Sequence, residues 1–137
     1  MPENFRISAS YLQLRTAAQH LRSLFEQSGV AEEMIGSCEL VLQELLTNIV
    51  DHAYEGDASQ SIEIHLSLKR ERLIIETADT GFAANVDLDA VAMPDPLDFQ
   101  EGGYGIAIIK TLADEISYRR EGDQNLWKLT IHTKNLS

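Results

Sequence analysis

Polar side chains that could bind a ligand or move a proton gather on one predicted helix. Glu44, Asn48 and His52 recur every four residues, and Asp51 lies beside them. At a step of about 100° per residue, with Glu44 at zero, Asn48 falls at about 40° and His52 at about 80°. The apolar arc spans roughly 60° to 240° on the same wheel, so these side chains lie at the edge of the core, where polar groups need partners. The stripe indicates either a binding site or a solvated helix edge whose amide bonds to backbone.

An Asp-Thr-Gly sequence, Asp79 to Gly81, stands where a predicted strand ends. An aspartate followed two residues later by a glycine is also common in turns. In the functional interpretation, the carboxylate points at a ligand from the strand end. Gly81 then lets the ligand approach the backbone closely, because a glycine has no side chain in the way.

Glycines also cluster at 102–105, just before another predicted helix, in the sequence Gly-Gly-Tyr-Gly. Backbone N–H groups at such a helix start bind anions without a basic side chain, although the glycines could equally serve a turn. Lys110 and the following threonine match the end of a P-loop, but Tyr104 and Ile109 occupy its glycine positions. The dinucleotide fingerprint also fails, because its third glycine is Ile108 here and no strand precedes it.

The charge balance narrows the classes of partner. The 137 residues include 11 basic and 22 acidic side chains, for a formal net charge of −11. Non-specific binding to nucleic acids or to anionic membranes needs clustered Lys and Arg, so we expect neither. The one cysteine, Cys38, cannot form an internal disulfide, which suits a reducing compartment. No apolar run approaches the ~18 residues of a membrane span, and the N-terminus does not resemble a signal peptide, so we expect a cytoplasmic protein.

Apolar periodicity predicts the elements that carry these residues. They are a strand at 5–10, helices at 11–27 and 31–54, a hairpin of 62–68 and 73–78, a helix at 106–113, and a hairpin of 115–120 and 126–133. We expect one domain, residues 1–137. Segregated helices and hairpins predict an α+β two-layer sandwich, with helices on one face of a mixed, mostly antiparallel sheet. Residues 82–101 show no clear period, and a loop of that length indicates a functional role.

Taken in order, these motifs resemble the GHKL ATPases, which have the Bergerat, or histidine kinase-like ATPase, fold. Within that superfamily the chain resembles the stand-alone anti-sigma-factor serine kinases, which restrain a sigma factor. The resemblance rests on segments 44–54, 79–82 and 102–110, and the tail at 113–125 is similar too. Many members carry a further glycine where this chain has Ala83, but the anti-sigma kinases vary there. The chain has no phospho-acceptor histidine helix and is too short for a second catalytic domain of the gyrase type.

The resemblance implies a role for each motif. Asn48 would ligate the Mg²⁺ that bridges the nucleotide phosphates, and Glu44 would be the general base that takes the proton of an attacking hydroxyl. Asp79 would accept a hydrogen bond from the adenine amino group, and Gly81 would let the base approach. Residues 82–101 would form the ATP lid.

Further residues of the implied site lie on the later elements. Backbone donors to the phosphates would come from the glycine-rich helix start: Gly103, Tyr104 and Gly105. His52 would either order the phosphate end of the nucleotide or cap a polar shoulder of its helix. Lys110 would add positive charge or remain solvated, and Thr130 would lie near the adenine.

The resemblance therefore implies an Mg-ATP-dependent serine/threonine-protein kinase that acts as an anti-sigma factor. It would sequester a sigma factor, phosphorylate a STAS-type anti-anti-sigma protein and form a homodimer. The alternative is a non-catalytic ATP- or ADP-binding regulatory module, against which Glu44 argues because a pure binder needs no carboxylate beside the γ-phosphate. An interaction domain without a nucleotide would require the three motifs to have fallen in order by chance.

Overall fold

The structure is a computed structural model that describes residues 2–84 and 105–133. Each predicted element is present, with ends displaced by a few residues. In chain order the elements are β1 (Glu3–Ser8), α1 (Tyr11–Phe25), α2 (Glu32–Asn48), the π-helical segment η1 (Ile49–Ala53), β2 (Ser61–Lys69), β3 (Arg72–Asp79), α3 (Gly105–Leu112), β4 (Glu115–Glu121) and β5 (Gln124–His132).

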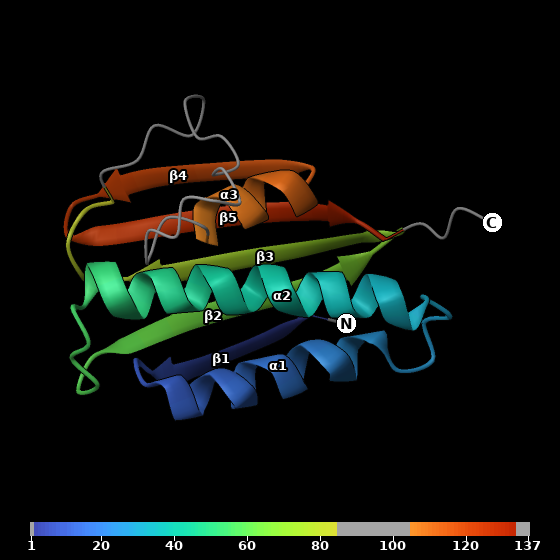
Figure 1. Cartoon of the computed structure of the whole chain (residues 1–137), viewed down its shortest axis with the longest axis horizontal. Coiled ribbons are helices and arrows are strands. Elements are labelled where there is room, and N and C mark those ends of the chain that lie inside the picture. Colours follow the sequence, from blue (N-terminus) through green and yellow to red (C-terminus); the bar gives the residue numbers. More distant parts are fainter. Residues whose placement is uncertain (1, 85–104, 134–137) are drawn as a thin grey trace, which may run out of the picture.

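The strands form one five-stranded sheet in the order β1-β2-β3-β5-β4, and the helices lie on one face of it (Figure 1). The α+β sandwich is therefore confirmed. All four described strand pairs are antiparallel, so the sheet shows no parallel pair among these residues. Because β5 pairs with β3 as well as β4, the final hairpin places Asn125 directly opposite Asp79.

Helix α2 lies between α1 and α3 over the sheet (Figure 1). The side chains on its apolar side are fully buried, each 0% exposed: Cys38, Val41, Leu42, Leu45 and Leu46. The facing side chains of the central strands, such as Ile62, Leu66 and Ile75, are buried equally completely. Burying a large aliphatic side chain stabilises a fold by about 1.5–3 kcal/mol, so this packing fixes the position and rotation of α2.

The first strand ends earlier than the sequence predicts. It was expected to run to Ser10, but it ends at Ser8. The reason is that Ser10 is the N-cap of α1, where its hydroxyl oxygen accepts a hydrogen bond from the backbone N–H of Gln13 at 3.4 Å. Serine is favoured at this position because it satisfies one of the free N–H groups of the first turn.

The end of the second helix departs from the predicted α-helix through Tyr54. From Ile49 to Ala53 the chain is π-helical, and the N–H of Tyr54 donates to the carbonyl of Ile49 at 3.0 Å. A π-helical turn holds more residues than an α-helical one, and such turns are frequent at functional sites. The wheel angle expected for His52 therefore does not hold.

Candidate functional site

Asp79 is a buried carboxylate at the end of β3, with 2% of its surface exposed. Its Oδ1 accepts hydrogen bonds from the backbone N–H of Gly81 at 3.0 Å and from Nδ2 of Asn125 at 2.8 Å. Its Oδ2 is buried with no hydrogen-bond partner among the described residues. Burial raises the pKa of Asp79, because desolvation penalises the charged form more than the two hydrogen bonds and Arg120 favour it. The side chain thus presents one acceptor oxygen that a ligand donor could satisfy.

Gly81 lies against the end of η1. A β-carbon at this position would stand 2.4 Å from the carbonyl oxygen of Ala53, and the N–H of Phe82 donates to the same oxygen at 2.8 Å. The sequence predicts that Gly81 permits close approach of a ligand. The structure shows that the protein's own backbone already occupies the space where a side chain would begin.

Asn125 ties this loop to the final hairpin, a role that the sequence did not indicate. It is 1% exposed, and its Nδ2 donates to Asp79 Oδ1 as well as to the carbonyl oxygens of Gly81 at 3.2 Å and Phe82 at 2.9 Å. Its Oδ1 accepts from the Tyr118 hydroxyl at 2.5 Å and the Arg120 guanidinium at 3.0 Å. In the sequence it stands at the end of the turn before the strand predicted at 126–133, a place that many surface asparagines share, and in the tail at 113–125 that resembles the family.

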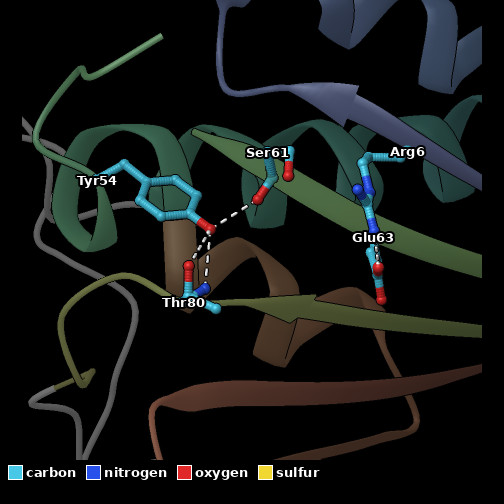
Figure 2. A network of polar contacts seen from close by, with 5 residues as sticks. All are labelled: Arg6, Tyr54, Ser61, Glu63 and Thr80. Atoms are coloured by element: carbon cyan, nitrogen blue, oxygen red, sulfur yellow. Dashed lines mark hydrogen bonds and ion pairs between the residues drawn. The ribbon is translucent and has the colours of Figure 1, made fainter. Parts of the chain in front are cut away.

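Tyr54 connects the end of η1 with β2 and with the residue after Asp79. Its hydroxyl donates to the carbonyl oxygen of Ser61 at 2.6 Å and accepts from the backbone N–H of Thr80 at 2.8 Å (Figure 2). Figure 2 also shows the ion pair of Arg6 and Glu63 farther along the sheet. Because the tyrosine ring is 6% exposed, these bonds are largely shielded from water and hold the Asp-Thr-Gly segment in place.

A cavity of about 400 Å³ opens between η1, the loop after Gly81, the start of α3 and β5. Its lining combines polar and apolar side chains: Asn48, Ile49, His52, Ala53, Phe82, Ala83, Ala84, Ile106, Asn125 and Trp127. The structure therefore brings the predicted site residues Asn48 and His52 to one cavity, and Asp79 is bonded to a residue of its wall. Asn48 is half-buried and His52 is exposed.

Glu44 and Gly105 meet where α2 packs against α3. Oε2 of Glu44 lies 3.0 Å from the position that a β-carbon on Gly105 would occupy, and Gly105 is the first residue of α3. The predicted base and the glycine-rich helix start are therefore neighbours. Gly103, Tyr104 and the part of the expected lid at 85–101 lie outside the described residues.

Two other predicted residues lie away from the cavity. Lys110 is in the last turn of α3 and is not among the lining residues. Thr130, which was expected near the adenine, is not among the residues that line the cavity. Successive side chains of a strand point to opposite faces, so Thr130 lies on the face opposite the one that Trp127 and Leu129 direct towards the helices.

The described residues hold no group of three or more His, Cys, Asp or Glu side chains that could bind a metal by itself. The same ranges, 2–84 and 105–133, contain no helix long and apolar enough to cross a membrane.

Residues 7–131 match the family model of the histidine kinase-like ATPase domain. Since this match spans most of the 137 residues, the chain belongs to that family. The cavity and the Asp-Thr-Gly segment thus lie in the fold of an ATPase domain.

The chain is similar to proteins named serine-protein kinase RsbW. It is 27% identical to the protein of Halalkalibacterium halodurans over 104 residues, which are 69% of this chain and 64% of that protein. With the Bacillus subtilis protein it shares 26% identity over 124 residues, 80% of this chain and 78% of that one. The match thus spans slightly less than two thirds of the first relative's length.

Two solved structures share the fold. One contains RsbU and RsbW domains from Mycobacterium tuberculosis, with a TM-score of 0.68, 17% identity, and coverage of 96% of this chain and 32% of that one. The other is the SiaB-SiaC complex from Pseudomonas aeruginosa, with a TM-score of 0.60, 14% identity, and coverage of 94% and 88%.

Proposed function

We propose that the chain is an Mg-ATP-dependent serine/threonine-protein kinase that acts as an anti-sigma factor. The observation that carries the proposal is the buried, unpartnered Oδ2 of Asp79, a residue bonded to Asn125 in the wall of the cavity that Asn48 and His52 also line. It occurs in a chain of the histidine kinase-like ATPase family whose relatives are named serine-protein kinases.

The base of the nucleotide would bind near Asp79. An adenine 6-amino group can donate a hydrogen bond, and Oδ2 is an acceptor that no described residue satisfies. Ile49, Ile106 and Trp127 give the cavity apolar walls against which a purine ring can pack. A volume of about 400 Å³ is within the usual range of small-molecule sites, about 300–1,000 Å³.

The phosphates would lie towards Asn48 and the start of α3. Mg²⁺ at nucleotide sites takes few protein ligands and completes its shell with phosphate oxygens and water, and here the amide oxygen of Asn48 would be a protein ligand. When bound, the ion would neutralise phosphate charge. Backbone N–H groups of Gly103, Tyr104 and Gly105 would bind the phosphates, and we assign His52 and Lys110 to the same end of the nucleotide.

Glu44 would act as the general base. The oxygen of a substrate serine or threonine would attack the γ-phosphorus, and its proton would pass to the Glu44 carboxylate. The bond from the γ-phosphorus to the β,γ-bridging oxygen would break, and ADP would leave. The place of Glu44 beside Gly105, one turn before Asn48, supports this role. The same carboxylate favours a kinase over the alternative, a non-catalytic ATP- or ADP-binding module.

The protein substrate would be a STAS-type anti-anti-sigma protein, and the second partner a sigma factor that the chain, as a homodimer, sequesters. A phosphoryl group adds about −1.5 to −2 charge at pH 7. Next to a chain of net charge −11, this added charge would favour release of the phosphorylated protein.

The test is phosphotransfer from radiolabelled ATP, with Mg²⁺, to a purified STAS-type protein from the same organism. Label on a serine or threonine of that protein supports the proposal. ATP binding without transfer to any STAS-type protein of the organism would favour the non-catalytic module instead.

A further inference from the structure

The amide of Asn125 can stand in only one orientation. Its Oδ1 faces the guanidinium of Arg120, which can only donate, and its Nδ2 faces the carbonyl oxygens of Gly81 and Phe82, which can only accept. The hydroxyl of Tyr118 accepts from the N–H of Ala84 at 2.9 Å, so its own proton is available for Asn125 Oδ1. Exchanging the amide oxygen and nitrogen would set Nδ2 against the Arg120 guanidinium and Oδ1 against the carbonyl oxygens of Gly81 and Phe82.

This orientation fixes the hydrogen-bonding character of Asp79. Because Nδ2 of Asn125 and the N–H of Gly81 both donate to Oδ1, that oxygen acts as an acceptor of two bonds. A proton added to Oδ1 would oppose both donors. Oδ2 is therefore the oxygen left to meet a ligand, and while the carboxylate is ionised it can only accept.

We propose that Asn125 is a positioning residue that makes the base end of the site select purines with a 6-amino group over purines with a 6-oxo group. It acts through Asp79, and its orientation is set by Tyr118 and Arg120 on the neighbouring strand. The inference rests on the proposed function, since it concerns the nucleotide of that site. The selectivity arises because a 6-oxo group is an acceptor facing another acceptor, and an unmatched buried polar pair weakens binding.

Without Asn125, the carboxylate loses one of the two donors that hold it. Water can then bridge Asp79 to a 6-oxo group, and a protonated Asp79 can donate to that group directly. Both effects would strengthen the binding of a 6-oxo purine and so lower the selectivity for a 6-amino purine. They leave Glu44 and Gly105 untouched, because those residues meet where α2 contacts α3 and neither of them lines the cavity.

The experiment compares the Kd of Mg-ATP with that of Mg-ITP, which carries a 6-oxo group. It uses the full chain, two variants, Asn125→Ala and Tyr118→Phe, and the control Gln124→Ala at an exposed position of the same hairpin. The wild type and the control should bind ATP at least about tenfold more tightly than ITP. In Asn125→Ala that ratio should fall towards one, and in Tyr118→Phe it should fall partway.

The outcomes separate the possible roles. A variant in which both nucleotides bind more weakly while their ratio stays unchanged has lost only structural support, and that result would overturn the inference. A wild type that binds ATP and ITP equally tightly would also overturn the inference. If the wild type binds neither nucleotide, the result overturns the proposed function, and with it the inference that rests on it. If Asn125→Ala does not fold, the ratio in Tyr118→Phe decides, because it removes one hydroxyl and leaves the bond from Arg120.

Discussion

Gly81 and Ala53 are in such close contact that only a glycine fits after β3. A β-carbon on Gly81 would stand 2.4 Å from the carbonyl oxygen of Ala53 and 2.6 Å from its carbonyl carbon. Contacts that short are essentially never seen for real β-carbons. The loop that carries the N–H donor to Asp79 is thereby fixed against the end of η1, at the edge of the cavity.

Gly81→Ala should therefore lower the free energy of unfolding by about 1–3 kcal/mol, the usual cost of overpacking, and weaken ATP binding. Urea unfolding and ATP titration would measure the two effects. The matched control is Gly36→Ala in α2, where an added β-carbon meets nothing within 4 Å and where alanine should stabilise by about 0.5–1 kcal/mol. A Gly81→Ala variant as stable as the wild type would show that this contact is absent in solution.

Glu44→Gln should bind ATP with nearly wild-type affinity and lose phosphotransfer by about 100-fold or more, the scale of general-base catalysis. The amide keeps the size of the side chain but cannot take the substrate proton. Single-turnover transfer to the STAS-type protein measures the loss, and Glu33→Gln, at an exposed position of the same helix, is the control. Wild-type transfer by Glu44→Gln would assign the base to another group.

The raised pKa of Asp79 predicts the sign of a pH effect on stability. A carboxyl whose pKa is raised from its ordinary 3.8 binds its proton more tightly in the folded state. Its contribution to stability is then full below pH 3.8 and is lost as the pH rises through the folded-state pKa. The unfolding free energy of the wild type minus that of Asp79→Asn should therefore increase as the pH is lowered from 7 to 4. A difference that decreases over this range would show that the hydrogen bonds outweigh the burial.

Cys38 should be unreactive in the folded protein. It is 0% exposed, and burial raises the pKa of its thiol to about 12, so the reactive thiolate is scarce at pH 8. A thiol-specific chromogenic reagent should label the wild type only when the chain unfolds. In Ser23→Cys, which adds a thiol at an exposed position of α1, one thiol should react at once and the other only on unfolding. Rapid reaction of the folded wild type would contradict the buried position.

Much of the fold was accessible from periodicity alone. Strict alternation at 62–68 predicted β2, and apolar spacing predicted the buried face of α2, because both patterns report which side of an element meets the core. The predicted strand end at Ser10 was displaced, because the Ser10 side chain caps helix α1. The choice between a strand end and a helix cap at a single serine is hard to predict from the apolar pattern of the sequence.

The parts of the site that escaped prediction depend on tertiary contacts. The π-helical turn ends at Ala53, whose carbonyl oxygen bonds to Phe82 far along the chain, and a helical wheel contains no such partner. In the sequence Asn125 is an ordinary turn residue. Only the pairing of β5 with β3 places it opposite Asp79. The face of the sheet on which Thr130 lies depends on strand register, which the sequence alone does not give. By contrast, Asn48 and His52 do line one cavity, although the chain between them is π-helical.

Calorimetric titration of the wild type and of Asp79→Ala with ATP in Mg²⁺ tests the central claim most directly. The account predicts saturable binding by the wild type and its loss in Asp79→Ala, with both proteins folded by circular dichroism. Failure of the folded wild type to bind ATP, with and without Mg²⁺, would contradict the nucleotide site and leave a partner-binding domain that keeps only the outline of an ATPase.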